Sequence, residues 1–159
     1  RQNMGGIGTG TRHHILLYPA LKKVRSMKKI KIVIVENDDD EQSFMKIGFN
    51  ISGLFDVLAM VKNGNQLEDW LNNNKEHLPE VILSDLNMPG KNGYDIIKEI
   101  RTNPDYKDIR VVITSTSSTK SIIDKCINLG AASYIVKPDT FINYLPFVKQ
   151  LYNDIIQLN

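Results

Sequence analysis

The chain has a single cysteine and lacks any long uninterrupted hydrophobic run. Cys126 cannot form an internal disulfide, which excludes a disulfide-stapled domain and favours a reducing, cytoplasmic environment. The longest apolar run near the N-terminus, residues 15–21, is interrupted by Pro19 and is far shorter than the roughly 20 residues that cross a bilayer. Its basic cluster follows it, whereas that of a signal peptide precedes it. We therefore predict neither a membrane segment nor a signal peptide.

The net charge is small and unevenly distributed. The formal charge is +2, but residues 1–26 hold five basic residues and no acidic one, while the remainder has 15 basic and 18 acidic residues. A mildly acidic domain without a helix-turn-helix segment does not favour DNA, because the basic stretch alone gives only nonspecific attraction. We interpret residues 1–27 as a flexible N-terminal extension or a cloning remnant, with Met27 as a candidate natural start.

From Lys28 onward, short β-branched apolar runs alternate with longer amphipathic ones. This alternation is typical of a parallel sheet covered by helices on both faces. We place strands at 31–35, 56–61, 81–84, 110–114 and 133–136, and helices at about 40–52, 66–73, 93–103, 119–129 and 141–157. Right-handed crossovers favour a single α/β domain over residues 28–159, with a doubly wound, five-stranded parallel sheet of flavodoxin-like order 2-1-3-4-5. Pro146 predicts either a kink in the last helix or a helix that starts near Asn143.

The third predicted strand ends at Asp85 and then breaks into turn residues. In open α/β sheets the carboxyl ends of the strands hold the ligand site. The first strand ends in Glu36 and Asn37 followed by four acids, and converging carboxylates are tolerated where they bind a hard cation such as Mg²⁺. The alternative role of residues 38–41 is to favour the positive end of the first helix, so we expect Glu36 and Asn37 to point to the site. A flavodoxin-like cofactor binder is disfavoured, because this acidic cluster repels phosphate without a metal.

The fourth and fifth predicted strands bring a hydroxyl and an ammonium to the same edge, at Ser115 and Lys137. A hydroxyl can donate to a phosphoryl oxygen, and an ammonium can neutralise an acidic pocket. Each signal is weak alone, because a Ser/Thr run before a helix commonly caps it and a strand-end lysine is commonly solvated.

An acid pair, a central aspartate, a hydroxyl, an aromatic residue and Lys-Pro stand in one order on five successive strand-helix units. This combination strongly resembles the receiver domain of two-component response regulators, over roughly residues 28–157. The resemblance implies that Asp85 accepts a phosphoryl group from a histidine kinase or phosphotransfer protein in a Mg²⁺-dependent reaction. It implies metal ligands at Glu36, Asn37, Asp85 and the Asn87 carbonyl, a phosphoryl contact at Lys137, and switch residues at Ser115 and Tyr134.

The resemblance also implies how the signal leaves the domain. A downstream protein, or a second copy in a homodimer, would meet the face of the fourth helix, fifth strand and fifth helix. Because the chain ends with that helix, we expect a stand-alone receiver, a phosphoacceptor that takes part in its own phosphorylation and dephosphorylation and is not otherwise an enzyme. One departure matters: the family usually has two acids at the end of the first strand, and Asn37 replaces the second. The alternative is a pseudo-receiver, a protein-interaction module that acts without phosphorylation.

Overall fold

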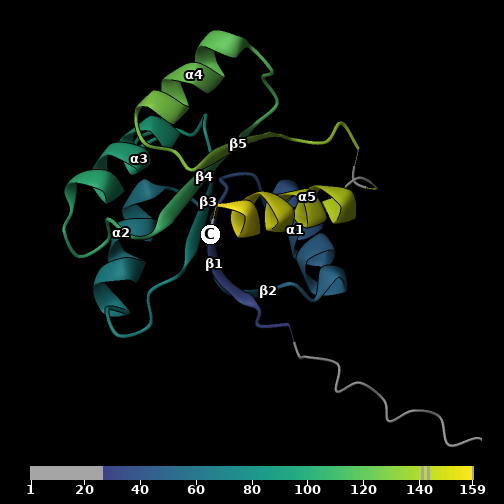
Figure 1. The fold of residues 1–159 in the computed structure, drawn as a ribbon, viewed down its shortest axis with the longest axis horizontal. Helices are drawn as coiled ribbons and strands as arrows, with labels where there is room; N and C mark the ends of the chain where they lie inside the picture. The colour runs from purple at the N-terminus through teal and green to yellow at the C-terminus, as the bar shows by residue number, and fades with distance from the viewer. Residues whose placement is uncertain (1–26, 141, 143, 159) are drawn as a thin grey trace, which may run out of the picture.

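The computed structural model describes residues 27–140, 142 and 144–158. Five parallel strands form one sheet in the order β2-β1-β3-β4-β5. The strands are β1 (Ile30–Val35), β2 (Phe55–Val61), β3 (Val81–Asp85), β4 (Arg110–Ser115) and β5 (Ser133–Val136). The helices are α1 (Asp39–Ser52), α2 (Gly64–Asn73), α3 (Gly93–Thr102), α4 (Lys120–Asn128) and α5 (Tyr144–Gln157). The predicted doubly wound, flavodoxin-like topology is confirmed (Figure 1).

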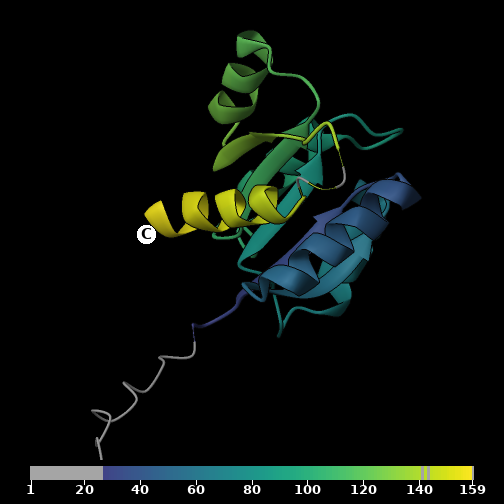
Figure 2. The same ribbon diagram turned by 90° about the vertical axis from the view of Figure 1, so that its right-hand side faces the viewer.

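The helices cover both faces of the sheet. Helices α1 and α5 lie on one side, and α2, α3 and α4 lie on the other (Figures 1 and 2). Interior strand β1 supplies both cores through its alternating side chains, with Ile32 and Ile34 facing α1 and α5 and Val33 and Val35 facing the other layer. This two-sided burial explains why the strands have nearly continuous apolar sequences.

Side-chain caps fix where several helices begin. Asp38 accepts a hydrogen bond from the Glu41 N–H at 2.8 Å at the start of α1. Helix α5 begins at Tyr144, three residues after the predicted start, which confirms the second of the two expectations for Pro146. Pro146 lies in the first turn, where backbone N–H groups have no partner within the helix, so its missing N–H breaks no helical bond.

The predicted N-terminal extension, residues 1–27, lies outside the described residues except for Met27, and its flexibility stays a prediction. A helix both long and apolar enough to cross a membrane is absent from the described part of the chain.

Candidate functional site

Four strands carry a polar side chain to the same face of the sheet at its carboxyl edge. Each of these strands has a residue in the core beneath α1 and α5, namely Ile34, Leu83, Val112 and Ile135. Since alternate residues of a strand share a face, the residue two positions further on lies on that side in each case. These residues are Glu36, Asp85, Thr114 and Lys137, and all four are buried.

Lys137 forms an ion pair with each of the two acids, Glu36 and Asp85. Its Nζ lies 2.6 Å from Glu36 Oε2 and 3.5 Å from Asp85 Oδ1. Burial raises the pKa of both carboxyls, while the ammonium opposes that rise. Burial alone would lower the pKa of Lys137, but its hydrogen bond to Glu36 and the nearby carboxylates raise the pKa above its ordinary value. Two carboxylates facing one ammonium leave the site with surplus negative charge.

The loop after β3 is tightly folded against the phosphoacceptor candidate. The backbone N–H groups of Asn87 and Leu86 favour the ionised form of Asp85 and partly offset the effect of burial on its pKa. A Cβ at Gly93 would lie 2.9 Å from Leu86 Cα and 3.0 Å from the Asp85 carbonyl oxygen. Only glycine therefore fits this close approach without a shift of the backbone, and the loop positions Asp85 at the rim of the sheet.

The predicted metal ligands offer oxygen atoms only, which Mg²⁺ prefers. Glu36 and Asp85 supply carboxylates, and Asn37 and Asn87 are exposed beside them. The next acid, Asp38, is engaged as the cap of α1. Among the described residues, no group of three or more His, Cys, Asp or Glu side chains is placed to hold a metal ion. A hard cation at this edge would therefore be held by only two carboxylates, together with the neutral oxygens of Asn37 and Asn87.

Both oxygens of the Glu36 carboxylate already have partners. Oε1 accepts a hydrogen bond from the Asp38 N–H at 3.1 Å, and Oε2 accepts one from Lys137. A cation that takes Glu36 as a ligand would share a carboxylate oxygen with one of these two donors.

The predicted switch residues form a separate chain of contacts. Ser115 is buried, and its Oγ accepts a hydrogen bond from the Ser117 N–H at 3.3 Å. The half-buried Tyr134 donates its hydroxyl to the Ser117 carbonyl at 2.7 Å. Ser115 follows the alternation of Ile113 toward the α2–α4 face, so the strand places it on the opposite side from Asp85. Ser117 thus links the two predicted switch residues.

Sequence reasoning missed two features of this edge. Thr114 belongs to the row of buried polar residues, and the two-residue alternation of β4 could have revealed it. The Tyr144 hydroxyl donates to Glu41 Oε2 and joins the first turns of α5 and α1. Burial and the Glu41 carboxylate raise the pKa of Tyr144. No sequence signal relates these two residues, which are 103 positions apart.

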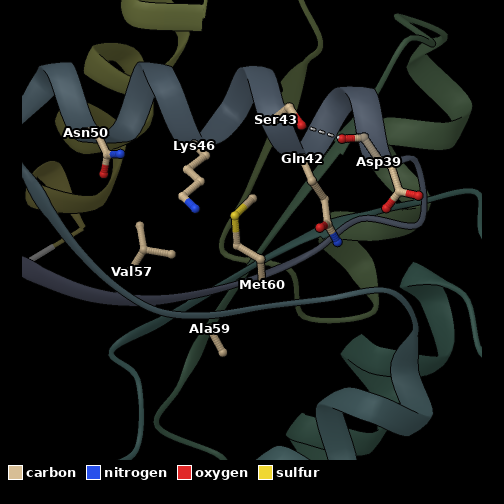
Figure 3. Close-up of a pocket in the computed structure, with 8 residues that line it drawn as sticks. All are labelled: Asp39, Gln42, Ser43, Lys46, Asn50, Val57, Ala59 and Met60. Atoms are coloured by element: carbon tan, nitrogen blue, oxygen red, sulfur yellow. Dashed lines mark hydrogen bonds between the residues drawn. The ribbon is translucent and has the colours of Figure 1, made fainter.

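A separate groove of about 500 Å³ lies between α1 and β2 (Figure 3). Its lining combines polar groups of α1, such as Lys46 and Asn50, with apolar side chains of β2, such as Val57 and Met60. The residues that line it do not include Glu36, Asp85 or Lys137, so the groove is distinct from the acidic edge.

Comparison with known proteins places the chain in a family. Residues 32–144 match the model of the response regulator receiver domain. The chemotaxis protein CheY homolog of Campylobacter jejuni is 28% identical over 111 residues, which cover 70% of this chain and 83% of that protein. The two-component response regulator ORR12 of Oryza sativa is 40% identical over 63 residues, which cover 40% of this chain and 52% of that protein.

Solved structures agree with this assignment. The phosphorylated cyanobacterial phytochrome response regulator RcpA aligns with a TM-score of 0.69 and 26% identity, covering 78% of this chain and 91% of that one. The Mn²⁺-bound form of response regulator Rcp1 aligns with a TM-score of 0.65 and 25% identity, covering 77% and 91% of the two chains. Because the family model spans well over half of the sequence and the fold agrees, this chain belongs to the response regulator receiver domain family.

Proposed function

We propose that this receiver domain accepts a phosphoryl group on Asp85 from a histidine kinase or phosphotransfer protein. The observation that carries the proposal is the placement of a buried carboxylate 3.5 Å from the Lys137 ammonium, at the end of the central strand β3. An Asp85 oxygen forms a bond to phosphorus while the bond from phosphorus to the donor's histidine nitrogen breaks. Such a transfer needs positioning and charge neutralisation more than acid-base catalysis.

The neighbouring residues support this chemistry. Glu36, Asn37, Asp85 and the Asn87 carbonyl would hold Mg²⁺, which neutralises charge on the phosphoryl oxygens when bound. That the related Rcp1 binds Mn²⁺ is consistent with a divalent metal here. Lys137 is already beside Asp85, and its ammonium turns from Glu36 toward the added phosphoryl oxygens.

Output passes through the face of α4, β5 and α5. The bond from Tyr134 to the Ser117 carbonyl ties β5 to the segment that leads into α4, so a movement at the neighbouring Ser115 alters this face. The three elements also carry partly exposed apolar side chains, Ile127, Val136 and Ile156, which suit a protein partner. We expect a downstream protein, or a second copy of the chain, to bind there in the cytoplasm, and we expect no DNA binding by this domain.

The proposal is tested by the mass of the intact protein after incubation with acetyl phosphate and Mg²⁺. We expect the parent to gain one phosphoryl group and an Asp85→Asn variant to gain none. A chelator added before the donor should prevent the gain in the parent. Equal gains in the parent and the variant would rule out Asp85 as the acceptor.

A pseudo-receiver that signals without phosphorylation is the second candidate, and Asn37 favours it. This residue is exposed and neutral where the family commonly has an acid, and the adjacent Asp38 carboxylate is engaged as a helix cap. The missing charge weakens the attraction for a divalent cation. If the parent gains no phosphoryl group while an Asn37→Asp variant does, the pseudo-receiver becomes the better account.

A further inference from the structure

Thr114 carries a buried hydroxyl that the proposed function leaves unexplained. The residue has an exposed fraction of 0%, and within the described part of the chain its Oγ1 has no hydrogen-bond partner. A hydroxyl in this situation loses its bonds to water without replacing them, which lowers the stability of the fold. Buried polar groups nearly always have partners, so an exception beside a functional site calls for a role in another state of the protein.

The sheet places Thr114 between the two groups that act on phosphate. Thr114 is directly paired with Asp85 of β3 on one side and with Ile135 of β5 on the other. Lys137 lies two residues beyond Ile135 and reaches back across β4 to bring its Nζ to within 3.5 Å of Asp85. Asp85, Thr114 and Lys137 share the face of the sheet that α1 and α5 cover. The Lys137 side chain therefore crosses the end of β4, which carries Thr114.

The hydrogen bonds of Lys137 must change when Asp85 is phosphorylated. An ammonium has three N–H donors, and Glu36 now accepts the shortest of these bonds, at 2.6 Å. A phosphoryl group on Asp85 adds negative oxygens on the other side of Lys137 and draws the ammonium away from Glu36. One donor then loses its acceptor, and Thr114 Oγ1 is an acceptor on the same face.

We propose that Thr114 Oγ1 accepts a hydrogen bond from the Lys137 ammonium as the phosphoryl group is transferred to Asp85, and keeps it while Asp85 carries that group. Thr114 is then a positioning residue that acts through Lys137 and holds it over the acceptor. This inference rests on the proposed phosphorylation of Asp85. It also explains why an unpaired hydroxyl occupies a core position of β4, where an aliphatic side chain would pack without cost to a polar group.

If Thr114 positions Lys137, removing its hydroxyl should affect the stability of the fold and the rate of phosphorylation in different directions. In Thr114→Val the unpaired hydroxyl is gone, so the unphosphorylated protein should unfold at the same or a higher urea concentration than the parent. The same variant should be phosphorylated more slowly, because Lys137 loses its acceptor. A threonine that only fills space would not produce this combination.

The experiment compares the parent, Thr114→Val and Thr114→Ser with acetyl phosphate and Mg²⁺, following the rate of the phosphoryl gain by intact mass. We expect the rate to fall about tenfold in the valine variant, as for one hydrogen bond to a charged group, and to stay within about twofold in the serine variant. Thr102→Val, which changes an exposed threonine at the end of α3, is the matched control and should match the parent.

Three outcomes would overturn the role proposed for Thr114. A valine variant that reacts as fast as the parent would overturn the role of Thr114 while leaving Asp85 as the acceptor. A serine variant that loses as much rate as the valine variant would also overturn it, because the hydroxyl would then not be the feature that matters. A parent that gains no phosphoryl group would overturn the proposed function itself, and this inference with it.

Discussion

Lys137 Nζ lies 2.6 Å from Glu36 Oε2, in a buried ion pair that joins the ends of β5 and β1 across 101 residues of sequence. The same ammonium is 3.5 Å from Asp85, so one positive charge serves two carboxylates. The two carboxylates therefore carry more negative charge than Lys137 alone neutralises.

Removing the shared ammonium should destabilise the fold. A Lys137→Met variant leaves two buried carboxylates without their cation, and breaking a buried ion pair in this way costs about 3 kcal/mol or more. Urea denaturation should show a clearly lower midpoint than the parent. The control is Lys120→Met, which removes an exposed pair with Asp124 and should change the free energy of unfolding by less than about 0.5 kcal/mol. Equal losses in the two variants would contradict the importance of the buried pair.

Mild acid should stabilise the protein through the acidic edge. The pKa values of Glu36 and Asp85 are raised above their ordinary values of 4.5 and 3.8, so the folded state binds protons more tightly than the unfolded state. The contribution of these groups to stability is therefore present at low pH and is lost as the pH rises through the folded pKa values. We expect the free energy of unfolding to increase on acidification through the folded pKa values more in the parent than in Asp85→Asn, as urea titrations at a series of pH values would measure.

The pH dependence of stability should also respond to Mg²⁺. Saturating Mg²⁺ should reduce the pH dependence of the parent, because the cation favours the ionised carboxylates. A parent and an Asp85→Asn variant with the same pH dependence would show that burial does not raise the pKa of this carboxyl.

Asp38 should act through the helix and not through a metal. Asp38→Asn retains an oxygen that can accept the hydrogen bond from the Glu41 N–H, so its stability should stay close to that of the parent. Asp38→Ala loses the cap and should lower the free energy of unfolding by about 1 kcal/mol. Calorimetric titration with Mg²⁺ should give similar affinities for the parent and Asp38→Asn. A large loss of affinity in Asp38→Asn would instead make Asp38 a ligand that compensates for Asn37.

Tyr134→Phe should loosen the segment between β4 and α4. The substitution removes the hydrogen bond to the Ser117 carbonyl, a contact worth about 1 kcal/mol. Hydrogen exchange of the backbone amides of residues 116–119 should become faster, while phosphorylation of Asp85 itself should persist. Unchanged exchange in this segment would contradict the coupling of Tyr134 to the switch loop.

The sequence was sufficient for the fold because local signals agree with it. Each of the five strands was predicted to within one residue at either end, since β-branched runs bounded by turn residues mark them clearly. The starts of α2 and α5 were missed by two and three residues. Helix α2 begins earlier because Asn63 caps it by accepting a bond from the Gln66 N–H, and helix ends depend on such local contacts.

The contacts of the site were less predictable. The predicted strand order places Glu36, Asp85 and Lys137 at one edge of the sheet. Only the structure shows that the Lys137 ammonium lies closer to Glu36 than to Asp85. The alternation of β4 places Ser115 and Thr114 on opposite faces, although the sequence presents them as equivalent hydroxyls. Such distinctions depend on register and side-chain packing between strands that are distant in sequence.

Phosphorylation of Asp85 is best tested by finding which residue carries the phosphoryl group. The protein is treated with acetyl phosphate and Mg²⁺ and then reduced with borohydride, which converts an aspartyl phosphate to homoserine, and its peptides are sequenced by mass spectrometry. We expect homoserine at position 85 and nowhere else in the acidic edge. Homoserine at another aspartate, or none in a protein that has gained a phosphoryl group, would contradict it.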